Sequence, residues 1–405
     1  MYLSIIRGAA TGPARAPGAV PSTVVGLGLV SLITDISAEM ITAVLPLYLM
    51  YGVGVGFLHL GAIEGLYAGA TAVLRLAGGY LADRLGKPKA VAVAGYGLSA
   101  LAKLGLPAAG GWLPGISLAI AADRAGKGIR TGPRDAMITL ATPADTLGRA
   151  FGVHRAMDTT GALLGPLVAT GLIALAAGYH AVFAVSFALG LTGVLVLVFF
   201  VPTPTAPPPP RARVAPRVAL ATLTAPGVRR ACLVAALLGL VTIGDMVLYV
   251  AVQQRAGLPA GVLPLLPLGT ALTFLLAAAP VGRLADRLGR WRVFLAGHGL
   301  LLLAYLLVGF AATGWVGAAL ALGLHGLFYA ATDGVLMAYV SPMFPTALRS
   351  TGLAAVQTAQ ALARAAGAVA VGAALQFTTV PTAFAGLAVL LGAAIAIGAR
   401  LGRPA

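Results

Sequence analysis

The sequence predicts an all-α polytopic membrane protein with twelve transmembrane helices, arranged as two pseudo-repeats of six. Its 405 residues are 59% hydrophobic and only 9% charged, and the mean hydropathy is +0.96. Soluble proteins carry roughly 25% charged residues, so this composition excludes a soluble enzyme of this size. Two further observations predict the class: long apolar runs recur along the chain, and one charged sequence occurs twice at a fixed offset.

The apolar runs are continuous, and most reach the length of about 18 residues that a membrane-spanning helix requires. They lie near residues 23–49, 58–81, 90–110, 113–140, 151–174, 178–201, 231–252, 261–282, 293–312, 315–340, 351–375 and 379–399. A β-barrel would instead need alternating segments of about 10 residues. The fourth run carries several charges, so the alternative for residues 124–135 is a loop rather than a helix.

The basic residues indicate the orientation. Eight basic and eight acidic residues fall inside the runs, so the net charge of +16 resides in the connections. Alternate connections hold 18 Lys and Arg residues on one side and only Arg255 on the other. The positive-inside rule then places both termini in the cytoplasm, as in a bacterial inner (plasma) membrane protein. The charge orients the chain in its lipid bilayer and does not indicate a nucleic-acid partner.

A proline-rich basic stretch, PTPTAPPPPRARVAPR at residues 202–217, contains no core-forming pattern and predicts a cytoplasmic linker. It divides the chain into a tail (1–22), a first six-helix half (23–201), the linker (202–230), a second half (231–400) and a short tail (401–405). The single cysteine, Cys232, excludes a disulfide framework.

The sequence GYLADRLGKPK at residues 79–89 recurs as GRLADRLGRWR at residues 282–292. Each copy follows the second span of its half, and parallel six-helix repeats are one layout of secondary transporters. The matched positions are Gly79, Asp83, Arg84, Gly86 and Lys87 in the first copy and Gly282, Asp286, Arg287, Gly289 and Arg290 in the second. With this loop signature in both halves, the chain resembles the major facilitator superfamily over its whole length. We expect both loops to act as conformational switches, since an acid at this turn can cap the next helix or pair across the interface between the halves. The alternative is a turn stabilised by Gly86 with ordinary topogenic charges.

Two further motifs carry the resemblance. Arg124, Gly128, Pro133 and Arg149 are similar to the fourth-helix pattern of the family, although Arg130 stands where a second glycine is usual. In the fifth span, Gly161, Gly165 and Pro166 match the pattern G-x-x-x-G-P, which the family associates with proton antiporters. The resemblance therefore implies the proton-coupled efflux branch, similar to drug:H+ antiporters. Close helix packing with a proline kink is the structural alternative for this motif.

The charges inside the spans are the candidate site. Asp123, Lys127, Arg130 and Arg134 are spaced four, three and four residues apart, which puts them on one helix face. Charges at this depth cost several kcal/mol unless they are paired or face water, so this face should line a central cavity. The candidate residues for proton coupling and cavity lining are Asp35, Glu39, Asp123, Arg124, Lys127, Arg130, Arg134, His154, Arg155, Asp158, Asp245 and Asp333.

We expect proton coupling to use Asp35 or Glu39 paired with Arg124, with a static ion-pair network as the alternative. The predicted function is proton-coupled export of a small molecule by alternating access, by a monomer without cofactor or enzymatic activity. One alternative is a divalent metal exporter for nickel, cobalt or iron, because Asp35, Glu39, Met40, His154 and Asp158 include suitable ligand types. The sequence is also compatible with a uniporter or importer of a small organic anion and with a non-transporting sensor or assembly factor.

Overall fold

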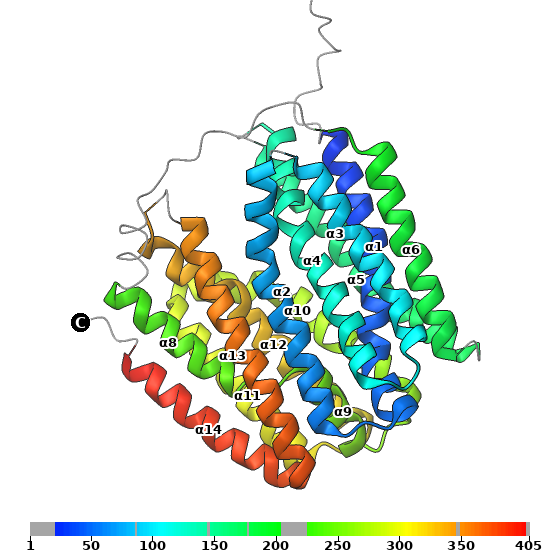
Figure 1. Cartoon of the computed structure of the whole chain (residues 1–405). Coiled ribbons are helices and arrows are strands. Elements are labelled where there is room, and N and C mark those ends of the chain that lie inside the picture. Colours follow the sequence, from blue (N-terminus) through cyan, green and yellow to red (C-terminus); the bar gives the residue numbers. More distant parts are fainter. Residues whose placement is uncertain are drawn as a thin grey trace, which may run out of the picture.

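The computed structural model describes residues 21–85, 87–143, 146–175, 178–203, 225–345 and 349–401, and no strand occurs among them. The first half contains α1 (Ser22–Leu47, continued by the π-helical turn η1, Tyr48–Val53), α2 (Phe57–Leu85), α3 (Pro88–Ala109), α4 (Leu113–Ala141), α5 (Leu147–Ala174) and α6 (Gly178–Phe200). The second half contains α8 (Pro226–Leu240), α9 (Asp245–Arg255), η2 (Ala260–Leu265), α10 (Leu266–Leu288), α11 (Arg290–Leu306), η3 (Leu307–Ala311), α12 (Gly314–Val340), η4 (Ser341–Met343), α13 (Arg349–Phe377) and α14 (Val380–Leu401). With α8 and α9 counted as one span, these are the twelve predicted helices (Figure 1).

The two halves repeat one packing pattern. In the first half, α1 packs against α5 and α6, α3 against α4 and α6, and α2 against α4. The corresponding pairs of the second half also pack together: α8 with α13 and α14, α11 with α12 and α14, and α10 with α12. The halves meet where α2 packs against α13 and where α5 packs against α10. Since α2 corresponds to α10 and α5 to α13 in the repeat, each of these two contacts is the counterpart of the other. Figure 1 shows α2 and α13 side by side between the two groups of helices.

The fourth span is one continuous helix, so the loop alternative for residues 124–135 is wrong. Close packing against α3 holds α4 in place: a Cβ at Gly126 would lie 2.6 Å from the backbone nitrogen of Ser99. Ten other helical segments among the described residues are long and apolar enough to cross a membrane. The six charges that α4 carries between Asp123 and Asp135 make its composition atypical, and their partners are described below.

The seventh span, predicted as one run over residues 231–252, is broken at residues 241–244 between α8 and α9. The Tyr305 hydroxyl of α11 bridges the break: it donates to the Val241 carbonyl (2.9 Å) and accepts from the Ile243 amide (2.7 Å). A backbone break at membrane depth needs such partners, because lipid offers none. The helix α8 begins at Pro226, within the segment assigned to the linker from the sequence. Linker residues 204–224 lie outside the described residues.

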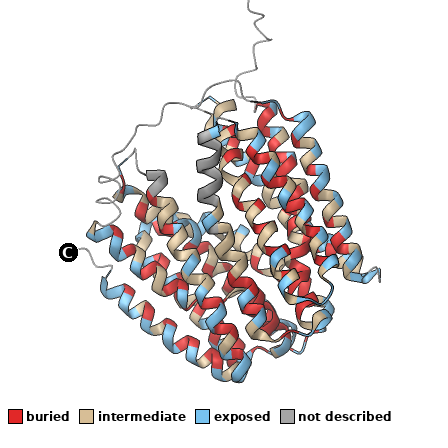
Figure 2. Ribbon diagram, in the orientation of Figure 1, coloured by how far each residue is buried: buried red, intermediate tan, exposed pale blue. Residues whose placement is uncertain are grey.

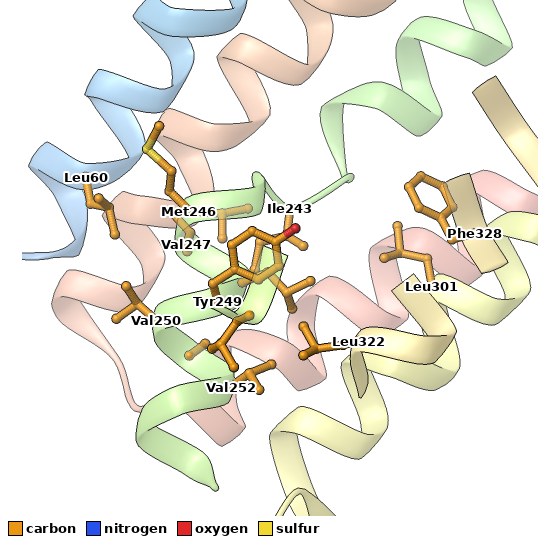
Figure 3. Packing of buried hydrophobic residues seen from close by; sticks show 14 of the residues in the cluster. Leu60, Ile243, Met246, Val247, Tyr249, Val250, Val252, Leu301, Leu322 and Phe328 are labelled. Carbon is orange, nitrogen blue, oxygen red and sulfur yellow. The ribbon is translucent and has the colours of Figure 1, made fainter. Parts of the chain in front are cut away.

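The helix α9 is buried on all sides. Figure 3 shows Leu60 of α2 on one side of it, and Leu301 of α11 with Leu322 and Phe328 of α12 on the other. Large exposed hydrophobic side chains lie elsewhere, on the outer helices, as expected for a surface in contact with lipid; Figure 2 shows exposed positions along the outer helix faces. The core of the molecule therefore surrounds the break in the seventh span.

We call the end where α6 stops and α8 starts the linker end, and the opposite end the far end. Described contacts between the halves gather toward the far end. The Tyr51 hydroxyl donates to Gln253 Oε1 (2.6 Å), and η2 packs against α1 and α5. In the far-end part of α2, a Cβ at Gly61 would lie 3.0 Å from Gly372 Cα. These contacts close the far end of the interface between the halves.

Candidate functional site

A central cavity lies between the halves. Two pockets of ≈ 370 Å³ and ≈ 490 Å³ share several lining residues, so they form one continuous space. The shared residues are Glu39, Thr42, Tyr67, Ala68, Asp245 and Arg364. The lining comes from α1, α2 and α4 in the first half and from the region of the α8–α9 break, α10, α12 and α13 in the second. Such a position suits a substrate site that opens alternately to the two ends of the molecule.

Acids of α1 face bases of α4. Lys127 Nζ lies 3.4 Å from Glu39 Oε1 and 4.0 Å from Asp35 Oδ1. Arg130 Nη2 lies 3.3 Å from Asp35 Oδ1, and its Nη1 donates to Thr34 Oγ1 at 2.8 Å. The Asp35 side chain is 8% exposed, whereas that of Glu39 is 24% exposed and lines the cavity. Of the face predicted from the spacing, Lys127 and Arg130 meet α1, and of these two Lys127 lines the central cavity.

The expected pairing of Arg124 with Asp35 or Glu39 is wrong. Arg124 forms its ion pair with its neighbour Asp123, which also accepts from Ser99 Oγ (2.5 Å) and lies 3.3 Å from Lys103 Nζ. The guanidinium of Arg124 stacks 4.0 Å from the centroid of the Tyr67 ring. Bases one and two turns farther along α4 are better placed to meet α1, so Arg124 remains at the cavity wall with an acid of its own.

The remaining α4 and α5 charges form a second cluster toward the linker end, next to Asp35. Asp158 accepts from Ser31 Oγ (2.7 Å) and lies 3.7 Å from Arg134 and 3.4 Å from Arg155. Arg134 also pairs with Asp135 at 3.0 Å. A third pocket of ≈ 540 Å³ is lined by Arg134, Asp135, His154 and Arg155, among others. These residues do not line the central cavity.

The ligand set suggested for a divalent metal does not assemble. Among the residues that the structure describes, no three His, Cys, Asp or Glu side chains come together as a metal-binding group. Asp35 and Glu39 face Arg130 and Lys127, while Met40 is fully buried in the hydrophobic core. His154 is buried near Asp158, and its Nε2 has no hydrogen-bond partner. Ion pairing with bases thus takes up the acids that a metal would need.

In the second half, Asp245 and Arg364 line the cavity and Asp333 does not. Asp245 accepts from the Tyr329 hydroxyl (2.7 Å) and lies 3.6 Å from His325 Nε2. The guanidinium of Arg364 lies 5.7 Å from the ring centroid of Tyr329. Asp333, predicted as a cavity residue, is exposed on α12 and lines neither central pocket.

Glu64 is a cavity residue that is absent from the site residues predicted from the sequence. This buried acid of α2 lines the cavity and accepts hydrogen bonds from the Met246 amide (2.9 Å) and the Val247 amide (3.2 Å). A side chain of one half thereby satisfies free amides at the start of α9 in the other half. A lone carboxylate in an otherwise apolar run was the available signal, since such residues within spans are usually functional.

The fifth-helix motif packs α5 against α1. A Cβ at Gly165 would lie 2.9 Å from the Ile36 carbonyl oxygen and 2.7 Å from Glu39 Cβ, and one at Gly161 would lie 3.0 Å from Leu32 Cα. Pro166 lies inside the helix, which continues through it. The motif therefore fixes the backbone of α1 beside Glu39.

The first copy of the loop motif is only partly described. The side chains of Asp83 and Arg84, and the whole of Gly86, lie outside the described residues, and Lys87 is exposed. In the second copy, Arg290 pairs with Asp286 at 2.9 Å and donates to the Ala338 carbonyl of α12 at 2.8 Å. Gly289 joins α10 to α11 with a φ of +99°, a conformation that favours glycine. This loop therefore links the ends of three helices, and Arg287 beside it is exposed.

Comparison with known protein families gives a match over most of the chain. The family model described as Major Facilitator Superfamily matches residues 27–368 and 265–404. An uncharacterised MFS-type transporter of Methanocaldococcus jannaschii is 30% identical over 339 residues, which cover 81% of this chain and 82% of that protein. An uncharacterised protein of Mycobacterium tuberculosis is 33% identical over 154 residues, which cover 38% of this chain and 37% of that protein.

Solved structures share the same fold. A point mutant of the nucleoside transporter NupG matches with a TM-score of 0.81 at 15% identity, covering 94% of this chain and 100% of that one. A point mutant of the peptide transporter POT in complex with sulfate matches with a TM-score of 0.79 at 17% identity, covering 97% of this chain and 96% of that one. At these identities the likeness establishes the fold alone.

Proposed function

Since the chain belongs to the Major Facilitator Superfamily, we propose that it is a proton-coupled secondary transporter that exports a small polar molecule. The observation that carries this proposal is the Glu39–Lys127 pair at the wall of the central cavity. Glu39 is the acid of the α1–α4 network that the cavity reaches, because Asp35 is buried behind it. A carboxylate in this position can exchange a proton with cavity water and can release Lys127 when it does so.

The direction of transport rests on two arguments. The G-x-x-x-G-P motif of α5 is associated in the family with antiporters, and here it packs against Glu39 itself. The count of basic residues supports a cytoplasmic position for the linker end. With the far end closed by contacts such as Tyr51–Gln253, the cavity would then receive its substrate from the cytoplasmic side. An exporter would load its substrate in this state and bind a proton from the opposite side.

The test is proton flux in everted membrane vesicles that contain the full chain, with a dye that reports the pH gradient. Candidate substrates are zwitterions, organic anions, lipophilic cations and the metals nickel, cobalt and iron(II). We expect one class to release protons from acidified vesicles, and the signal should vanish in Glu39→Gln but persist in Asp333→Asn, which changes an exposed acid. Movement of substrate without any proton signal would establish a uniporter instead.

A further inference from the structure

The charges that line the central cavity balance formally. The acids are Glu39, Glu64 and Asp245, and the bases are Arg124, Lys127 and Arg364. Four of these six already have strong partners within the protein. Arg124 pairs with Asp123, Lys127 pairs with Glu39, and Glu64 accepts from two backbone amides. The charges available to a ligand are therefore those of the remaining two residues.

Arg364 is the first of these two. It forms no hydrogen bond or ion pair with any residue that the structure describes, and its buried Nε has no partner. Its guanidinium lies 5.7 Å from the ring centroids of both Phe328 and Tyr329. A guanidinium without acceptors in a cavity of low dielectric is costly, and a carboxylate or phosphate group offers bidentate acceptors.

Asp245 is the second lining residue whose charge is available to a ligand. It receives one hydrogen bond from Tyr329 and faces His325 at 3.6 Å, but no Lys or Arg among the described residues pairs with it. Its side chain is 45% exposed to the cavity space at the start of α9. A carboxylate held in this way can accept an ammonium group from a ligand.

Small residues bring Arg364 to this place. The helices α8 and α13 approach closely at Gly239 and Gly367, where a Cβ at Gly367 would lie 2.9 Å from the Leu240 carbonyl carbon. A Cβ at Gly239 would lie 3.5 Å from Arg364 Cγ, so the aliphatic part of Arg364 passes directly over α8. This packing sets the guanidinium beside the break at residues 241–244, close to the helix that begins with Asp245.

We propose that the substrate of the central cavity is a small zwitterion, whose anionic group binds Arg364 and whose ammonium group binds Asp245. This inference rests on the proposed transport function. A ligand with only an anionic group would leave the charge of Asp245 without a partner in the occupied cavity. A ligand with only a cationic group would leave the charge of Arg364 without one. Either case carries the desolvation cost of an unpaired charge. The zwitterion compensates both charges at once and enters a lining that is neutral as a whole.

The rest of the lining indicates the skeleton of the substrate. The side chains of Tyr67, Tyr249, Phe274 and Tyr329 face the same space, which has ≈ 370 Å³ in its deeper part. This combination of aromatic walls with a few polar groups is typical of small-molecule sites. An amino acid or short peptide with an apolar side group fits both the charges and the walls.

The test measures binding, with no ion gradient, so that failure of proton coupling leaves it unaffected. Thermal unfolding of the purified full chain in detergent is followed with three compounds: phenylalanine, glutamine and alanyl-alanine. Each is compared with its methyl ester, which is a cation, and its N-acetyl derivative, which is an anion. We expect at least one zwitterion to stabilise the protein, with half-saturation at a concentration at least about tenfold lower than for either derivative.

Variants assign the two charges. Arg364→Gln should weaken binding of the zwitterion at least about tenfold, so that the methyl ester binds as tightly as the zwitterion. Asp245→Asn should weaken binding of the zwitterion to the same extent, so that the N-acetyl derivative binds as tightly as the zwitterion. Arg364→Lys should restore part of the preference for the zwitterion over its methyl ester. If Arg364 had only a structural role, lysine would not restore this preference. Arg283→Gln and Asp333→Asn, both at exposed positions, are the matched controls and should bind as the parent does. An ester or N-acetyl derivative that binds the parent as tightly as its zwitterion, or the absence of stabilisation by all three zwitterions, would overturn the proposal.

Discussion

Glu39 and Asp35 are one helical turn apart, yet their surroundings separate their roles. Asp35 is buried and meets Arg130, a side chain that is itself only 3% exposed. Glu39 is reached by the cavity and meets Lys127, which is 30% exposed. The sequence predicts both acids as site residues from spacing alone. It does not rank them, because their exposure is set by α5 and α4, which come more than 70 residues later.

This difference predicts that neutralising the two acids has unequal effects on stability. Asp35→Asn removes the carboxylate beside a buried Arg130, which leaves a charge that water cannot reach and should lower the free energy of unfolding by about 3–5 kcal/mol. Glu39→Gln should change stability by less than about 1 kcal/mol, because Lys127 is partly exposed. Thermal unfolding of both variants in detergent makes the comparison. Equal losses of stability would contradict the separation of a structural acid from a cavity acid.

At the scale of the helix, the seventh span shows where prediction from sequence fails. Residues 231–252 form a largely apolar run without proline, and the pair Gly244–Asp245 is a weak local signal for the break at 241–244. The break is satisfied by Tyr305 from α11 and Glu64 from α2, both distant in sequence. The fourth span illustrates the reverse case. Its charges leave a loop as the alternative to the expected helix, but partners on α1 and α3 keep it helical.

Glu64 stabilises the contact of α2 with α9, so its loss should loosen the far end. In a Cys232→Ser background, Gln253→Cys places the only thiol at a position that is buried while Tyr51 contacts it. We expect Glu64→Gln to raise the alkylation rate of this thiol several-fold, since the two amides lose a charged acceptor. Rates are normalised to Tyr51→Cys, an exposed site, and Glu39→Gln serves as the matched acid control. An unchanged rate would mean that Glu64 does not hold the halves together.

The α5 motif provides a comparison within one helix. A methyl group at Gly165 would meet the Ile36 carbonyl and Glu39 Cβ at less than 3.0 Å, whereas nothing lies within 4 Å at Gly171. Gly165→Ala should therefore separate α1 from α5 and destabilise the protein by about 1–3 kcal/mol, while Gly171→Ala should be neutral or slightly stabilising. Thermal unfolding of the two variants tests this prediction. If both changes prove harmless, the close approach of α1 and α5 is not required for the fold.

For the whole molecule, the repeated loop sequence predicts more than the number of helices. Every packing pair of the first half described above has its counterpart in the second half. The two contacts between the halves, α2 with α13 and α5 with α10, are also counterparts of each other. What the sequence does not predict is the state of the interface. Closure at the far end depends on contacts such as Tyr51–Gln253, which join residues about 200 positions apart and have no local signal.

That closure leads to a prediction about the complete cycle. In the Cys232→Ser background, Tyr51→Cys and Gln253→Cys can be joined by a short bismaleimide, which fixes the two halves together at the far end. Alternating access requires these residues to separate, so the cross-link should reduce proton-coupled flux to the background of empty vesicles. The cavity should still bind its ligand, because neither Tyr51 nor Gln253 lines it, and either single cysteine treated with the same reagent should remain active. Full transport by the cross-linked protein would show that the far end stays closed throughout, and that the cavity does not open alternately to the two ends.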